Sequence, residues 1–218
     1  MKTLDQIIQD FEKEEVEGEG TTFSPSGAPI ADFDTVYAPA DQSVPATFLQ
    51  SEYNGTNYDV DLDSKYQPTM FSVSWLRTHD LTQNMSDPLT KDLLMGLLAN
   101  DPRWTFYNYK SNIQKVNNNL YRVKIDNRQL PGGVTSSRTV EFHIDDNDVL
   151  EKVRLVYSVA QYNVSKDMYS QEVNFVYPYA YDQDDDDDNG QQSTSSSQDD
   201  DKDDDNDVDT SLLNDLGF

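Results

Sequence analysis

Apolar and polar residues alternate along much of the chain, most regularly in its second half. An alternation with a period of two places apolar side chains on one face of a β-strand and polar side chains on the other. Asn54-Gly55 and the run Asp145–Asp148 lie between such stretches and have the chemistry of hairpin turns. The pattern therefore predicts antiparallel strands at residues 47–53, 57–62, 69–78, 103–110, 118–126, 138–145, 149–159 and 170–181.

A helical spacing of apolar residues interrupts this alternation in two places. Residues 3–15 carry apolar side chains three and four positions apart, and Thr3 with Gln6 forms the pattern of a capping box. Residues 87–100 carry a stripe of leucines that follows Pro88, a residue suited to the first turn of a helix. We therefore expect a short N-terminal helix and one internal helix among the strands.

Many antiparallel strands with one internal helix predict a mainly β, β-rich α+β fold. Two architectures satisfy this expectation. The first is an OB-like barrel, the five-stranded oligonucleotide-binding fold. The second is a curved antiparallel sheet wrapped around helices, as in the nuclear-transport-factor-like fold. The number of predicted strands does not separate the two.

Composition divides the chain into three segments. Residues 1–45 combine the N-terminal helix with a stretch rich in Gly, Pro and acids, which predicts a flexible acidic arm. Residues 46–181 hold all the predicted strands and should form the globular domain. Residues 182–218 contain 15 acids and one base, so we expect a disordered acidic tail. Of the net charge of −25, the body without this tail keeps −11.

The residue types that most catalytic and metal sites need are scarce. The chain has no cysteine and only two histidines. The aspartates of residues 59–63 alternate like calcium ligands, but the glycine and the glutamate of an EF-hand loop are missing. We therefore expect no enzyme, no metal site and no cofactor. No run approaches the ~20 apolar residues that a membrane span requires, so we expect a soluble, cytoplasmic protein.

The positive charge of the body is concentrated in one window. Residues 103–138 contain seven bases, one acid and five aromatic side chains. Rings interleaved with cations suit single-stranded DNA, because bases stack on the rings and cations follow the phosphates. The predicted nucleic-acid-binding residues are Arg103, Tyr107, Tyr109, Lys110, Tyr121, Arg122, Lys124 and Arg128. The alternative interpretation is an ordinary amphipathic sheet whose outward positions are basic.

The acidic tail ends in the apolar sequence "DTSLLNDLGF". An acidic segment with an apolar end resembles the C-terminal tail of bacterial and phage single-stranded-DNA-binding proteins. In that family such tails dock in pockets of replication and repair proteins. The resemblance covers the tail only, and it implies that partner proteins are recruited through Leu212, Leu213, Asp215, Leu216 and Phe218.

Two functional hypotheses follow from the sequence. The first is a single-stranded DNA-binding protein of phage or mobile-element replication or recombination, whose tail recruits partner proteins. The alternative is a non-enzymatic assembly or structural protein, such as a virion, conjugation or cell-surface component, with a nuclear-transport-factor-like body. In that alternative the arm and the tail contact protein and not nucleic acid. An oligomer is possible in both.

Overall fold

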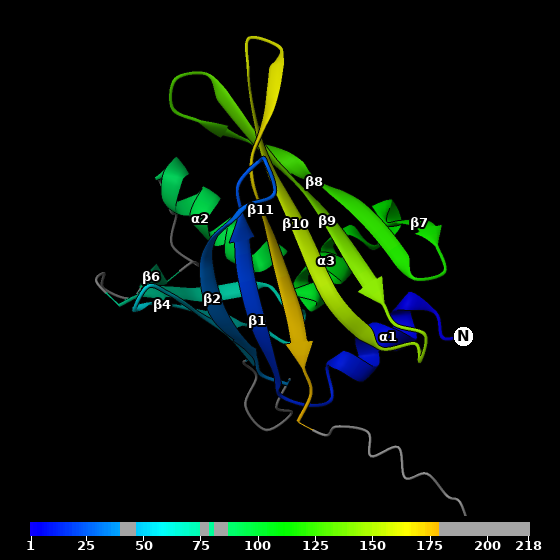
Figure 1. The fold of residues 1–218 in the computed structure, drawn as a ribbon. Coiled ribbons are helices and arrows are strands. Elements are labelled where there is room, and N and C mark those ends of the chain that lie inside the picture. Colours follow the sequence, from blue (N-terminus) through cyan, green and yellow to red (C-terminus); the bar gives the residue numbers. More distant parts are fainter. Residues whose placement is uncertain (40–46, 75–78, 81–86, 179–218) are drawn as a thin grey trace, which may run out of the picture. The chain divides into compact units, whose positions relative to one another are not determined.

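The computed structural model describes residues 1–39, 47–74, 79–80 and 87–178. Residues 1–181 form one compact unit, and the predicted tail at 182–218 lies outside the described residues. In the described part of the chain, eleven strands form one antiparallel sheet that is accompanied by three α-helices (Figure 1). The predicted mainly β fold class is confirmed.

The sheet consists of two meanders that meet at its centre. The first is made of β1 (Val16–Phe23), β2 (Pro29–Tyr37), β3 (Thr47–Tyr53), β4 (Thr56–Leu62), β5 (Pro68–Val73) and β6 (His79–Asp80). The second is made of β7 (Gln114–Asn117), β8 (Leu120–Leu130), β9 (Val134–Ile144), β10 (Leu150–Gln161) and β11 (Val164–Val176). The order β6-β5-β4-β3-β2-β1-β11-β10-β9-β8-β7 joins the meanders through the antiparallel pair β1–β11.

The predicted acidic arm is the main error in the expected organisation. Its residues form β1 and β2, which lie at the middle of the sheet and pair along most of their length. The glycines of β1 do not mark a flexible segment. These strand positions require glycine because neighbouring side chains occupy the space that a Cβ atom would fill. A Cβ built on Gly20 would lie 2.3 Å from the ring of Phe33, and one on Gly18 would lie 2.5 Å from Val173. The compact unit therefore begins at the N-terminus and not near residue 46.

Two of the helices agree with the sequence pattern. α1 (Leu4–Phe11) begins with the predicted capping box of Thr3 and Gln6, and α2 (Pro88–Ala99) is capped by Asp87. The third helix contradicts the predicted strand at 103–110. That segment forms α3 (Pro102–Tyr109), capped by Asp101, and the short 3-10 helix η1 (Lys110–Asn112).

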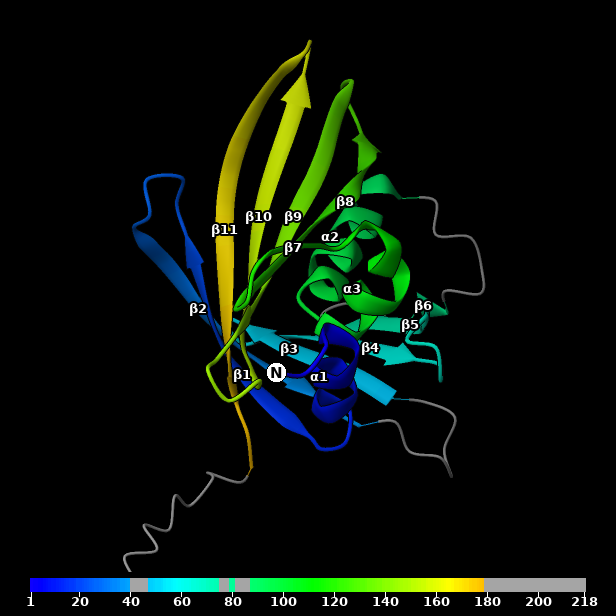
Figure 2. The same ribbon diagram turned by 90° about the vertical axis from the view of Figure 1, so that its right-hand side faces the viewer.

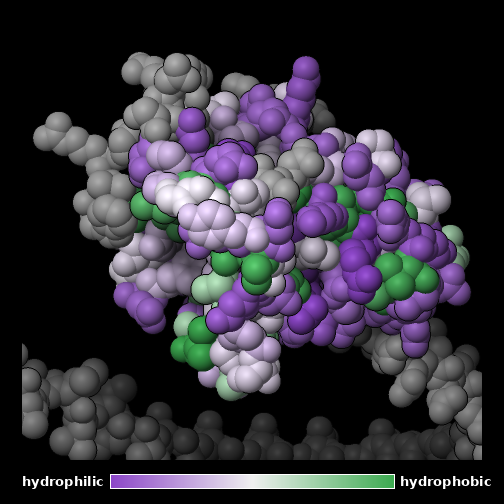
Figure 3. Space-filling model, turned by 90° about the horizontal axis from the view of Figure 1, so that it is seen from above, coloured by the Kyte–Doolittle hydropathy of each residue, from purple (hydrophilic) through white to green (hydrophobic). Residues whose placement is uncertain are grey.

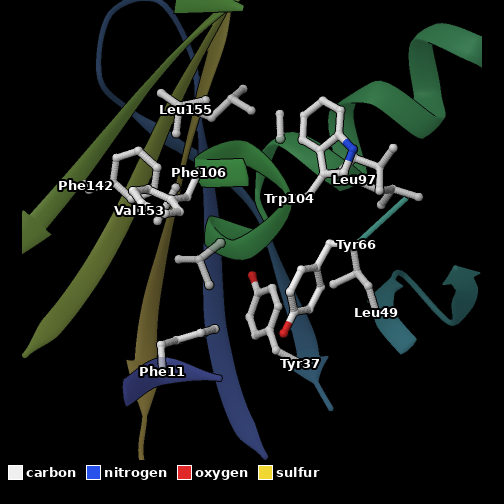
Figure 4. Packing of buried hydrophobic residues seen from close by; sticks show 14 of the residues in the cluster. Phe11, Tyr37, Leu49, Tyr66, Leu97, Trp104, Phe106, Phe142, Val153 and Leu155 are labelled. Carbon is white, nitrogen blue, oxygen red and sulfur yellow. The ribbon is translucent and has the colours of Figure 1, made fainter. Parts of the chain in front are cut away.

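The three helices lie on the inner face of the sheet, which curves around them (Figure 2). Inward-facing residues of both meanders and the apolar faces of α1, α2 and α3 form a single buried cluster. Phe11, Tyr37, Trp104 and Phe142 come from different elements and meet in this core (Figure 4). A curved sheet around helices is thus the observed arrangement, and a five-stranded OB-like barrel is not, since the sheet ends at β6 and β7.

Candidate functional site

Arg103 was predicted to face nucleic acid, and that prediction is wrong. It lies in the first turn of α3 with 1% of its surface exposed. Its Nη2 is 2.8 Å from a carboxylate oxygen of Asp101, and Nη1 donates to the carbonyl of Ala38. The guanidinium also lies 5.0 Å from the ring centroid of Tyr66 and 5.8 Å from that of Tyr37. Burial disfavours the charge, but the attraction of Asp101 outweighs it and raises the pKa of Arg103.

Arg138, another base of the predicted window, has the same structural role between the sheet and α2. Its Nη1 donates to Asp92 over 3.0 Å, and Nη2 donates to the backbone carbonyl of Asp92 over 2.9 Å. Asp92 also accepts hydrogen bonds from Ser136 (2.7 Å) and Tyr157 (3.0 Å). Burial would raise the pKa of this carboxyl, but the hydrogen bonds and the charge of Arg138 together lower it. α2 approaches closely because Gly96 faces the guanidinium.

Arg122 belongs to a row of alternating charges on the outer face of the sheet. The row runs from β8 to β11 through Arg122, Glu141, Arg154 and Glu172, which are neighbours in register. Arg122 lies 2.7 Å from Glu141, and Arg154 lies 3.5 Å from both Glu141 and Glu172. Burial acts to raise the pKa of Glu141, but Arg122 and Arg154 lower it overall. These bases are therefore neutralised by carboxylates within the fold.

The predicted residues on α3 and η1 follow a helix and not a strand. Lys110 lies 2.6 Å from Asp5 of α1, so its charge is also paired. Tyr107 is exposed on one side, and its ring stacks on Tyr66 at a centroid distance of 5.4 Å. Tyr109 is partly buried against the core. This group binds α1 and the β4–β5 turn to α3.

The remaining three predicted residues lie on two faces of β8. Lys124 is exposed on the outer face, while Tyr121 shares the opposite face with the buried Val123 and Ile125. A register shift after Ile125 places Arg128 opposite Ser136, which faces α2. The eight predicted nucleic-acid-binding residues therefore do not form one surface. The predicted partner-binding residues at 212–218 lie outside the described residues.

An acidic cavity of about 420 Å³ lies where α1 leads into β1 and where β11 ends. It is lined by Glu14, Glu15, Glu17, Val176, Tyr177 and Pro178. Across the described residues, no group of three or more acidic or histidine side chains converges as metal ligands would. The cavity therefore offers negative charge without a defined coordination geometry.

A different region gathers exposed apolar side chains. The β1–β2, β8–β9 and β10–β11 hairpins and the start of α2 all lie at the upper end of the sheet (Figures 1 and 2). Gln161 donates to the carbonyl of Gly132 over 2.9 Å, which ties the β10–β11 hairpin to the β8–β9 hairpin. We call this region the hairpin end; Figure 3 views the molecule from this side and shows apolar side chains among hydrophilic ones.

The β10–β11 hairpin carries an unusual turn. Tyr162 and Asn163 connect the strands with φ angles of +50° and +64°, and Tyr162 is 89% exposed. A bulky residue rarely adopts a positive φ, and such two-residue turns favour Asn, Asp or Gly. Val164 and Met168 are 70% and 42% exposed in the adjoining strand. We call Tyr162, Val164 and Met168 the apolar tip.

The helices leave the inner face uncovered next to this tip. Along β11, every residue from Val164 to Met168 is exposed, whereas burial begins at Tyr169. At the start of α2, Leu89 is 59% and Leu93 is 37% exposed. The alternation along β8, β9 and β10 places three further apolar side chains on this part of the inner face, where they are partly exposed. We call these five residues the inner patch: Leu89, Leu93, Leu130, Val134 and Val159.

The hairpin end is also electrically neutral. Residues 24–31, 87–93, 126–138 and 157–169, which form it, contain four bases and four acids. The body as a whole carries a net charge of −11. Apolar exposure and local neutrality thus occur together at one end. The sequence predicts the last strand from residue 170 only, whereas β11 begins at Val164. Tyr162-Asn163 is not one of the residue pairs that signal a two-residue hairpin turn, so this hairpin was missed.

No protein-family model matches the chain, and no curated protein matches it. Among solved structures, the chain is similar to the crystal structure of a DUF1329 family protein from Desulfovibrio piger. The two share 10% sequence identity and a TM-score of 0.32 over 79% of this chain and 88% of that one, and a likeness this distant carries no argument. None of the described helices has the length and apolar character needed to cross a membrane.

Proposed function

We propose that this chain is a non-enzymatic assembly protein that docks a protein surface through its hairpin end. The observation that carries the proposal is Tyr162, an aromatic side chain held almost fully in solvent by a backbone conformation that such residues avoid. The described structure gives its ring no partner that would repay this strain. Local rules of sequence and structure are broken mainly where function requires it.

The surroundings of Tyr162 support a protein partner. Exposed apolar side chains that gather at one place mark interaction sites more often than single ones do. Tyr and Met are also enriched at the centres of protein interfaces, where charged residues are depleted. The hairpin end exposes Tyr162 and Met168, and its charges balance. The outer face of β1–β4, in contrast, exposes acids such as Glu19, Asp34 and Glu52.

Single-stranded DNA has less support as the ligand. Arg103, Arg138, Arg122 and Lys110 are each engaged by a carboxylate of the fold. To bind phosphate, these side chains would have to give up ion pairs, two of which are buried. Among the described residues, Lys115, Lys124 and Arg128 of the same window form no ion pair. So few cations on a body of net charge −11 give little attraction for a polyanion.

Photocrosslinking from defined positions tests the proposal. A photoreactive phenylalanine analogue replaces Tyr162 in one chain and Tyr107 in a control chain, and both are expressed in the native host. Tyr107 is an aromatic residue that is also exposed, but it lies on α3. We expect a discrete protein adduct from position 162 that excess unlabelled wild-type chain competes away, and none from position 107. Equal adducts from both positions, or none from position 162, would refute the proposal.

A further inference from the structure

We infer that the partner of the hairpin end is a second copy of this chain, bound as a two-fold dimer in which the apolar tip of each copy covers the inner patch of the other. This inference rests on the proposed function and names its partner. The same end of the chain carries both projecting apolar side chains and exposed apolar side chains on the inner face.

The two elements are suited to each other in shape. The tip is a two-residue hairpin that projects beyond the helices, so it has to enter a recessed or open surface to bury Tyr162. The inner patch is the open part of the concave face, bounded by the start of α2 and by β8, β9 and β10. A two-fold axis lets both tips dock at once, because in such an interface residue i meets j and j meets i.

Tip and patch lie close together in the sheet, which a reciprocal contact requires. Val164 pairs with Gln161 in the hairpin, and two residues further along each strand Lys166 pairs with Val159 of the patch. Val159 in turn pairs with Ser136, whose hydroxyl contacts α2. The same strands thus connect the tip to the patch without a flexible segment between them.

Charge distribution favours this face over the others for self-association. Two copies of a chain with a net charge of −25 repel each other in most orientations. The segments of the hairpin end have four bases and four acids. Contact between two hairpin ends therefore adds less electrostatic repulsion than contact between the acidic surfaces of the body. Added salt should therefore strengthen the dimer by screening the remaining long-range repulsion. A dimer held by opposite charges would weaken under the same change.

Sedimentation of the full chain across concentration is the first test. We expect a reversible dimer with a dissociation constant on the order of 1–100 µM, since the two elements form an interface at the small end of the known range. Tyr162→Asn should weaken this dimer about tenfold or more, as loss of a central aromatic anchor does. Asn is favoured at positive φ, so this variant should keep or improve the turn. Val116→Thr, on the exposed edge strand β7, is the control and should leave dimerisation unchanged.

Engineered cysteines test the arrangement itself, because the chain has no native cysteine. A chain with Tyr162→Cys is mixed with a chain carrying Leu89→Cys under mild oxidation. We expect this mixed disulfide to form faster than one between Tyr162→Cys and Val116→Cys. Equal rates in the two mixtures would overturn the inference, and so would a dimer that Tyr162→Asn does not weaken.

The outcomes separate this inference from the function on which it rests. A chain that stays monomeric at every concentration, while position 162 still crosslinks to a different protein, overturns self-docking alone. A monomeric chain with no adduct at position 162 overturns the proposed function as well. An adduct of twice the chain's mass from position 162, together with a dimer that Tyr162→Asn weakens in sedimentation, supports both.

Discussion

Replacing Arg138 by methionine should strongly destabilise the fold, because Asp92 would remain buried without its cationic partner. Arg138 is 3% exposed, donates to Asp92 over 3.0 Å and lies 4.6 Å from the ring centroid of Tyr157. Removing one partner of a buried ion pair costs about 3–5 kcal/mol. That is a large part of the ~5–15 kcal/mol by which domains are stable.

The magnitude can be checked against a second substitution. In Arg138→Met combined with Asp92→Asn, the buried charge disappears. The asparagine oxygen can accept from one of the Ser136 and Tyr157 hydroxyls, and its NH2 group can donate to the other. We therefore expect the double variant to be about 1–2 kcal/mol more stable than Arg138→Met alone. Lys124→Met removes a cation from the outer face of β8 and should change the free energy of unfolding by no more than about 0.5 kcal/mol.

Urea unfolding followed by circular dichroism measures these differences. At a typical slope of about 2 kcal/mol per M, Arg138→Met should lower the midpoint by on the order of 2 M. The difference in unfolding free energy between wild type and Arg138→Met should also shrink in acid. The pKa of Asp92 is lowered in the folded state, so its ionised carboxylate stabilises the fold fully above the ordinary value of 3.8. This stabilisation is lost as the pH falls through the folded-state pKa. A cost for Arg138→Met close to that of Lys124→Met, or strict additivity in the double variant, would refute the reasoning.

Gly20→Ala should destabilise the protein by about 1–3 kcal/mol, because its Cβ would clash with the ring of Phe33; a flexible arm would tolerate the change, so unchanged thermal stability would contradict the position of β1. Glu12→Gln should raise the melting temperature at neutral pH, since burial raises the pKa of Glu12 against the hydrogen bonds from Tyr107 and Tyr66 that lower it. The charged Glu12 side chain destabilises the fold above its folded-state pKa, and this cost vanishes below the ordinary value of 4.5. The rise in melting temperature should therefore disappear in acid. A rise that does not depend on pH would argue against burial of the charge as its cause. Labelled oligo-dT should show no saturable change in anisotropy at physiological salt with the full chain or with a chain ending at Tyr181, whereas saturable binding that weakens with salt would restore the nucleic-acid hypothesis.

The sequence predicted correctly those elements whose signals lie within a few neighbouring residues. The capping box at Thr3, the leucine-rich helix after Pro88 and the turn at Asn54-Gly55 all occur as the sequence predicts. Each of these signals lies within a few residues, so tertiary contacts have little opportunity to override it. The strands predicted at 47–53, 57–62 and 149–159 were found for the same reason.

The errors arose where a distant partner decides the outcome. The segment 103–110 is rich in aromatic residues that favour strands, but Asp101-Pro102 starts a helix there and packing on the core retains it. The glycines of β1 indicate flexibility in the sequence alone, and only the ring of Phe33 shows that close approach requires them. Arg138 pairs with Asp92, a residue 46 positions away, so sequence proximity could not show that its charge is neutralised.

Hydrogen–deuterium exchange of the full chain, compared between dilute and concentrated solutions, measures whether a second copy covers the hairpin end. We predict that amides of residues 161–168 and of the first turn of α2 exchange more slowly at high concentration, while β7 and the outer face of β8 and β9 do not change. Slower exchange confined to β7 or the outer face, or no dependence on concentration anywhere, would contradict self-docking through the hairpin end.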